Sequence, residues 1–137
     1  MAFKFERLEV WQLAIEYIDL TYDLANQLPK SEEYNLKSQI VRAATSVALN
    51  IAEGSTSQTD PEQARFLSMA IRSLLETVAC QKIIKRRDFI SDTNLLDHAY
   101  SSAQTLAAKL HTLRKSLVPD LYQAREDSAL YETGGVQ

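Results

Sequence analysis

Apolar side chains recur at steps of three and four residues along most of this chain, which is the spacing of one face of an α-helix. In residues 6–28 they form two stripes: Leu8, Trp11, Ile15, Ile18, Tyr22 and Ala25 in the first, and Leu13, Tyr17, Leu20, Leu24 and Leu28 in the second. At about 100° per residue, the two stripes lie on roughly opposite sides of the helix. A monomeric bundle needs only one of them.

Apolar surface in excess of a monomer's core usually marks an interface. We therefore predict that most of the second stripe meets another subunit, through Leu13, Tyr17, Leu20 and Leu24.

Start and stop signals place two further helices. Ser31, followed by acidic residues, predicts an N-cap, and Gly54 is a natural helix end. The next helix has a sharper start, with Asp60 as its N-cap and Pro61 at its first helical position, and it is expected to end near Arg87.

A fourth helix is expected from Asp92 to just before Pro119. Four amphipathic helices of about 22 to 28 residues with short connections predict an all-α, up-down-up-down antiparallel four-helix bundle. We expect this bundle to occupy residues 1–118. Residues 119–137 are expected to form an acidic tail, partly disordered or loosely docked.

Composition supports helices and limits the function. Three glycines and three prolines in 137 residues are too few for the many tight turns of an all-β fold. The chain has no run of about 18 apolar residues and no signal-peptide pattern, and its single cysteine cannot form an internal disulfide, so a cytoplasmic location is expected.

The net charge of −3 comes from the end of the chain. Residues 118–137 hold four of the 18 acidic and one of the 15 basic side chains, which leaves 14 of each in the rest. A neutral body disfavours tight nonspecific binding of nucleic acid but allows a local basic patch.

The second helix carries an unusual polar stripe. Its core face is centred on Ile40 and contains Leu36, Ala43, Ala44, Val47 and Ile51. An adjoining arc of small side chains holds Val41, Thr45, Ala48 and Ala52. The remaining side is polar and holds Gln39, Arg42, Ser46, Asn50 and Glu53. The polar side is either a solvated outer face or a subunit interface. In the second case Arg42, Asn50 and Glu53 would set the register of the subunits. An incorrect arrangement of the subunits would leave these buried polar groups unpaired, which costs free energy.

Three segments resemble one family. The segments FERLEVWQLA (Phe5–Ala14), SQIVRAATSVALNIAEG (Ser38–Gly54) and ARFLSMAIRSLLETVACQ (Ala64–Gln81) resemble the four-helix-bundle proteins encoded by bacterial 23S rRNA intervening sequences, formerly called the S23 ribosomal protein group. That group is similar to the accessory variability protein of diversity-generating retroelements. Asn50–Gly54 with Arg42 is the most specific part of a resemblance that covers about residues 3–117.

The resemblance implies a ring-like homopentamer without enzymatic activity, and its retroelement relatives bind nucleic acid through basic surfaces. Two departures stand out. Ala48 occupies a position where relatives commonly place proline, and the turn after Gly54, STSQTD, lacks an arginine that many relatives carry. The missing arginine weakens the expectation that this chain binds RNA more than it weakens the expectation of a pentamer.

Residues with catalytic chemistry are few. His98 and His111 lie about 140° apart on one helix and cannot share a metal or a reaction, and each is expected to be a surface or boundary residue. Cys80 is expected to be a small packed residue. The chain has no Glu-x-x-His motif and no phosphate-binding glycine loop, so we expect no enzyme, no metal site and no cofactor.

The strongest charge feature is QKIIKRRDF, with Lys82, Lys85, Arg86 and Arg87 at the end of the third helix. These cations either complement the helix dipole or form an RNA-facing patch. In a ring of five subunits, four charges each become about twenty. Phe89 is expected to anchor the helix end rather than stack on a base.

The sequence thus predicts a non-enzymatic, homo-oligomeric scaffold with RNA as a candidate partner. The alternative is an adaptor that binds another protein and has no role with nucleic acid.

Overall fold

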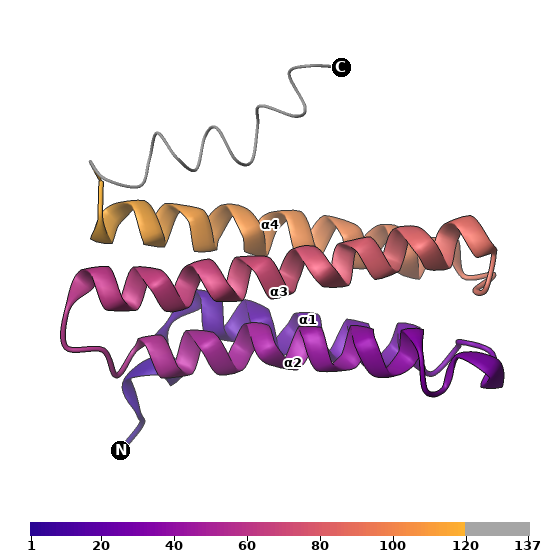
Figure 1. Cartoon of the computed structure of the whole chain (residues 1–137), viewed down its shortest axis with the longest axis horizontal. Coiled ribbons are helices and arrows are strands. Elements are labelled where there is room, and N and C mark those ends of the chain that lie inside the picture. Colours follow the sequence, from indigo (N-terminus) through magenta and orange to yellow (C-terminus); the bar gives the residue numbers. More distant parts are fainter. Residues whose placement is uncertain (120–137) are drawn as a thin grey trace.

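Four α-helices make up most of the computed structural model, which describes residues 1–119 (Figure 1). They are α1 (Glu9–Ala25), α2 (Leu36–Gly54), α3 (Asp60–Arg87) and α4 (Thr93–Leu117), with short 3₁₀ turns at Lys4–Arg7 and Lys30–Glu32. Each helix packs against its neighbours in the chain, and α1 also packs against α4, so the helices close into an antiparallel bundle. No strand occurs in residues 1–119.

The all-helical prediction is therefore confirmed. Within residues 1–119, no helix is both long enough and apolar enough to cross a membrane. The predicted acidic tail lies, from residue 120 onward, outside the described residues.

The first two helices are shorter than the pattern predicted. α1 has 17 residues and starts after Leu8, whose backbone is extended and follows the 3₁₀ turn. α2 has 19 residues and starts after Asn35 instead of Ser31. Residues 31–35 offer no side chain to the core, and Tyr34 is 96% exposed, so a helical turn there would gain no packing.

The long helices begin close to the predicted positions. At α3 the N-cap is Thr59, whose side-chain oxygen accepts a hydrogen bond from the Glu62 amide at 3.3 Å, so Asp60 is the first helical residue rather than the cap. α4 begins at Thr93, one residue after the predicted start, and Asp92 is its N-cap, because its carboxylate accepts a hydrogen bond from the Leu95 amide at 3.0 Å. α3 ends at Arg87, as predicted, and its C-cap is Asp88, a non-glycine residue in the left-handed conformation with φ 57°.

The core face of α1 is the opposite of the predicted one. Tyr17 is 1% exposed and Leu24 0%, so both lie inside their own chain, and their assignment to a subunit interface is wrong. Leu13 and Leu20 are half-buried beside them. Periodicity revealed two stripes but not which of them α2 and α4 cover.

The core face of α2 agrees with the prediction. Every member of the predicted set is buried: Leu36, Ile40, Ala43, Ala44, Val47 and Ile51. Ala48, which was placed on the adjoining arc, is also buried, at 2% exposure.

Candidate assembly face and nucleic-acid interface

An apolar strip remains on the outside of α1. It consists of Trp11, Ile15, Ile18 and Tyr22, of which Ile15 is 38% and Tyr22 46% exposed, while the other two are half-buried. On the same helix, Glu9 forms an ion pair with Lys109 of α4 at 3.2 Å, which marks the side that faces α4. Ile18 lies about 180° from Glu9 around the helix, so the strip borders α2.

α2 continues this strip with smaller side chains. The hydrogen bond between the Ser46 and Ser73 hydroxyls, 2.9 Å long, marks the side of α2 that faces α3. Val41 and Ala52 lie about 120–140° away from Ser46, and both are half-buried. We call the combined surface the α1–α2 face: Trp11, Ile15, Ile18, Tyr22, Val41, Thr45 and Ala52, with Leu49, 58% exposed, at its edge.

The residues of the predicted polar stripe of α2 differ in how far the structure buries them. Arg42 and Glu53 are exposed. Asn50 is half-buried, and its side-chain amide donates to the carbonyl and the hydroxyl of Ser46 at 2.9 and 3.1 Å. The structure thus accounts for Asn50 within one chain, and the role of all three residues at an interface stays a prediction.

Tyr17 belongs to a buried polar network between α1 and α3. Its hydroxyl lies 2.7 Å from the Thr77 hydroxyl and accepts a hydrogen bond from the Gln81 amide at 2.6 Å. Burial raises the pKa of Tyr17 from 10.0 to about 12, against the opposing effect of its hydrogen bond to Thr77. The sequence did not predict this network because its members are some 60 residues apart.

The four basic residues of the predicted patch are all exposed, but they do not all line the same groove. The Lys82 ammonium lies 4.1 Å from the centroid of the Tyr100 ring, and with Lys85 it lines a groove of about 250 Å³ between α3 and α4. Arg87 lines a different hollow, between α2 and α3, and its guanidinium lies 5.6 Å from the Phe89 ring.

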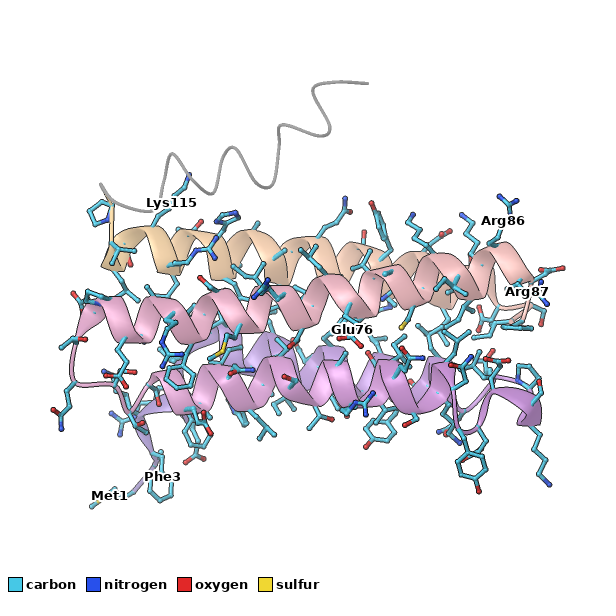
Figure 2. All side chains as sticks on the ribbon, in the orientation of Figure 1. Met1, Phe3, Glu76, Arg86, Arg87 and Lys115 are labelled. Atoms are coloured by element: carbon cyan, nitrogen blue, oxygen red, sulfur yellow. The ribbon has the colours of Figure 1, made fainter. Side chains whose placement is uncertain are left out.

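Four other basic residues near the chain ends, Lys4, Arg7, Arg114 and Lys115, lie away from this cluster. Figure 2 shows Phe3 and Lys115 at the end of the bundle opposite Arg86 and Arg87. Arg114 is only 2% exposed and donates to the Ser68 hydroxyl at 3.0 Å, so it ties α3 to α4. No extension of the patch forms from these residues.

The remaining candidates are structural. Arg114 also donates to the Nδ1 atom of His111 at 2.7 Å, since a guanidinium only donates. Cys80 is 4% exposed, as expected for a packed residue. Burial, and then the Glu76 carboxylate, raise the pKa of its thiol. Within residues 1–119, no group of three or more potential metal ligands comes together.

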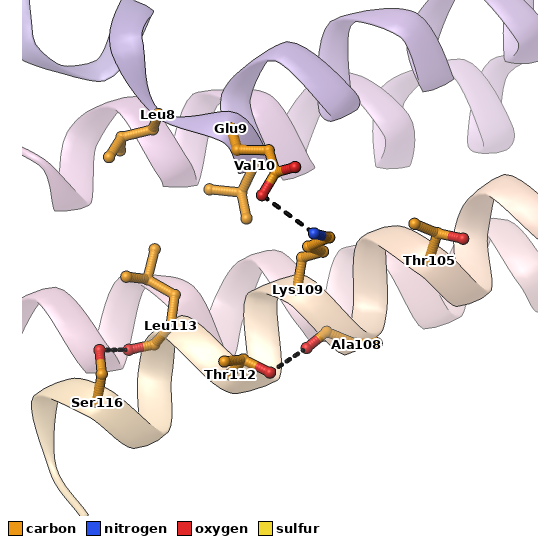
Figure 3. Close-up of a pocket in the computed structure, with 9 residues that line it drawn as sticks. All are labelled: Leu8, Glu9, Val10, Thr105, Ala108, Lys109, Thr112, Leu113 and Ser116. Carbon is orange, nitrogen blue, oxygen red and sulfur yellow. Dashed lines mark hydrogen bonds and ion pairs between the residues drawn. The ribbon is translucent and has the colours of Figure 1, made fainter.

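A larger groove, of about 660 Å³, lies between the start of α1 and the second half of α4 (Figure 3). Its walls include Leu8, Val10 and Leu113, and the Glu9–Lys109 ion pair crosses it. The hydroxyls of Thr112 and Ser116 donate to carbonyls of their own helix, those of Ala108 and Leu113. These polar groups are thus engaged within the protein.

The fold and its surfaces define a class: a small antiparallel four-helix bundle that carries a surplus apolar face and a basic groove. The chain belongs to the 23S rRNA-intervening sequence protein family, whose model matches residues 6–115. This match confirms the resemblance of the three segments and spans all four helices. No curated protein matches the sequence.

A solved structure shares the fold. It is the 1.70 Å crystal structure of a protein of unknown function from the S23 ribosomal protein family of Bacteroides thetaiotaomicron VPI-5482. The similarity has a TM-score of 0.56 at 20% identity and covers 80% of this chain and 95% of the other.

Proposed function

We propose that this protein is a non-enzymatic, self-assembling scaffold of the cytoplasm that binds RNA through the basic end of α3. The observation that carries the proposal is the α1–α2 face, where Ile15 and Tyr22 stay exposed although the bundle already has a complete core.

Self-assembly accounts for this apolar surface. Burying the exposed parts of such side chains stabilises an association by about 25 cal/mol per Å² of apolar area. The small residues of α2 allow a second helix to approach closely. A ring of five subunits is the expected assembly, on the resemblance to the intervening-sequence group and its retroelement relatives.

RNA is the partner that the basic cluster favours. Lys82, Lys85 and Arg86 are exposed on the last turns of one helix. Copies of this cluster around a ring would give a multivalent surface for phosphates, which binds far more tightly than one site.

A second candidate is an adaptor for another protein. Leu75 and Ile83 of α3, each 48% exposed, favour it because they lie away from the α1–α2 face and would stay accessible in an assembly through that face.

The assembly is tested by light scattering on a sizing column. We expect a mass near five subunits for the natural sequence. Replacing Ile15 and Tyr22 by glutamate should give monomers, because each charge would be desolvated at the interface. The control is Leu75→Glu, at a residue of matching exposure, which should leave the mass unchanged. A natural protein that runs as a monomer would refute the assembly.

RNA binding is tested by fluorescence anisotropy at several salt concentrations. Lys85→Glu with Arg86→Glu should abolish binding and flatten its salt dependence. The control, Arg65→Glu with Arg72→Glu, makes the same change of charge at exposed sites of the same helix and should retain most of the binding. Equal losses in both variants would mean that RNA recognises general charge rather than this cluster.

A further inference from the structure

The groove between α3 and α4 has a composition that simple phosphate binding does not explain. Its floor is formed by Leu96 and Gln81, which are 5% and 3% exposed. One rim carries Lys82 and Lys85, and the other carries Asp97 and Tyr100. An aromatic ring, two cations and one carboxylate thus surround a partly apolar hollow.

The two rims are in register. Lys82 lies over the Tyr100 ring, and in antiparallel helices three residues further along α3 correspond to three residues back along α4. Lys85 and Asp97 therefore occupy the next level of the groove. Among residues 1–119, no ion pair joins Lys85 to Asp97, and both side chains are exposed. A cation and an anion thus line one hollow without forming an ion pair.

We propose that this groove binds one unpaired nucleotide of RNA, with guanine preferred, a site that rests on the RNA binding proposed above. The base stacks on Tyr100, Asp97 accepts hydrogen bonds from the edge of the base, and Lys82 and Lys85 contact the flanking phosphates. At about 250 Å³ the hollow lies just below the usual range for drug-sized ligands and suits a single flat ring system.

The preference for guanine follows from Asp97. A carboxylate only accepts hydrogen bonds, and guanine presents two adjacent N–H donors on its Watson–Crick edge. Uracil presents one N–H between two carbonyl oxygens, which the carboxylate repels. The same carboxylate disfavours an acidic peptide, which would suit lysines alone. A paired base has its edge occupied, so single-stranded RNA is the expected form.

Lys82 allows the base to enter. A cation–π pair with a solvent-exposed lysine is a weak interaction, so the Lys82 side chain can leave the half-buried Tyr100 ring for a phosphate when a base takes its place. The lysine then exchanges one favourable contact for a stronger, charge-assisted one.

The first experiment uses the full chain with guanosine and uridine 5′-monophosphates as probes and follows backbone NMR shifts. We expect saturable shifts at Leu96, Asp97 and Tyr100, with guanosine monophosphate binding about tenfold more tightly than uridine monophosphate. Shifts that never saturate, shifts elsewhere only, or equal affinities would overturn the proposal.

The second experiment compares single-stranded RNAs of about 12 nucleotides, all uridine or with one guanosine. Tyr100→Leu should weaken binding of the guanosine-containing RNA about 5- to 100-fold, whereas Tyr100→Phe should bind like the natural protein because it keeps the ring. Asp97→Asn should remove the preference for guanosine. Matched controls are Tyr34→Leu and Asp23→Asn, at exposed sites outside the groove.

The results separate the two proposals. If RNA binds and depends on Lys85 and Arg86 but not on Tyr100, the nucleotide site is wrong and the proposed function stands. If no RNA binds while guanosine monophosphate saturates the groove, the proposed function fails, and the groove recognises a free guanine nucleotide instead of a nucleotide of RNA. Equal competition by an oligo-glutamate peptide would refute recognition of a base.

Discussion

Tyr17 shows how strongly a single polar group depends on its surroundings. Its ring fills the core, and its hydroxyl is held by Thr77 and Gln81 of α3. Losing a partner in such a buried group costs about 1–3 kcal/mol, so these contacts also fix α1 against α3. In the sequence, Tyr17 is one apolar-looking member of a stripe.

The raised pKa of Tyr17 predicts a loss of stability at high pH. The folded value is about 12 and the unfolded value 10.0, so the unfolded chain loses its proton first. This contribution is fully present below pH 10, and it falls by about 1.4 kcal/mol per pH unit as the pH rises toward 12. Urea unfolding between pH 9 and pH 12 would measure the slope.

Two variants test the origin of this slope. Tyr17→Phe should be less stable at pH 8, because Thr77 and Gln81 lose a partner, but should lack the contribution of Tyr17 above pH 10. Tyr34→Phe, at a residue 96% exposed, should keep the natural slope. Identical slopes in all three proteins would contradict the prediction.

At the scale of the helices, Gly54 sets how closely α2 approaches α3. It was expected to end α2 through the conformational freedom of glycine, and it is the last residue of that helix. However, its φ is not positive. A Cβ atom at Gly54 would lie 2.9 Å from the Cβ atom of Phe66, closer than real side chains pack.

Gly54→Ala should therefore lower the free energy of unfolding. Overpacking of this kind costs about 1–3 kcal/mol, which exceeds the gain of about 1 kcal/mol in helix propensity. Thermal and urea unfolding would measure the change. Ser101→Ala, at an exposed position of α4, is the control and should change stability by less than about 0.5 kcal/mol. A variant as stable as the natural protein would show that α2 and α3 separate at no cost.

At the scale of the whole molecule, the proposed assembly predicts that thermal stability depends on protein concentration. Subunits that bind only folded partners stabilise the folded state by mass action, by about 1.1 kcal/mol per subunit of a pentamer for each tenfold rise in concentration. The melting temperature should thus rise by several degrees over that range.

Differential scanning calorimetry at several protein concentrations would measure this rise. Tyr22→Glu should remove it, because its charge lies on the α1–α2 face, whereas Leu75→Glu should retain it. A melting temperature independent of concentration in the natural protein would argue for a stable monomer.

Local patterns in the sequence determined the class of this protein. The steps of three and four residues predicted four helices, every residue placed on the core face of α2 is buried, and α4 begins one residue after its predicted start at Asp92. These features depend on neighbours within about one helical turn, so the sequence contains the information needed. The three family segments were recognisable for the same reason, since they are contiguous.

Only the tertiary structure decided which side of α1 faces inward, because both stripes have helical spacing and the choice depends on α2 and α4. It also placed Arg114 in the interior beside Ser68, separated the end of α3 from the basic residues near the N-terminus, and set Tyr100 opposite Lys82. Each of these contacts joins residues distant in the chain. Their geometry depends on how the helices pack together, which no local pattern specifies.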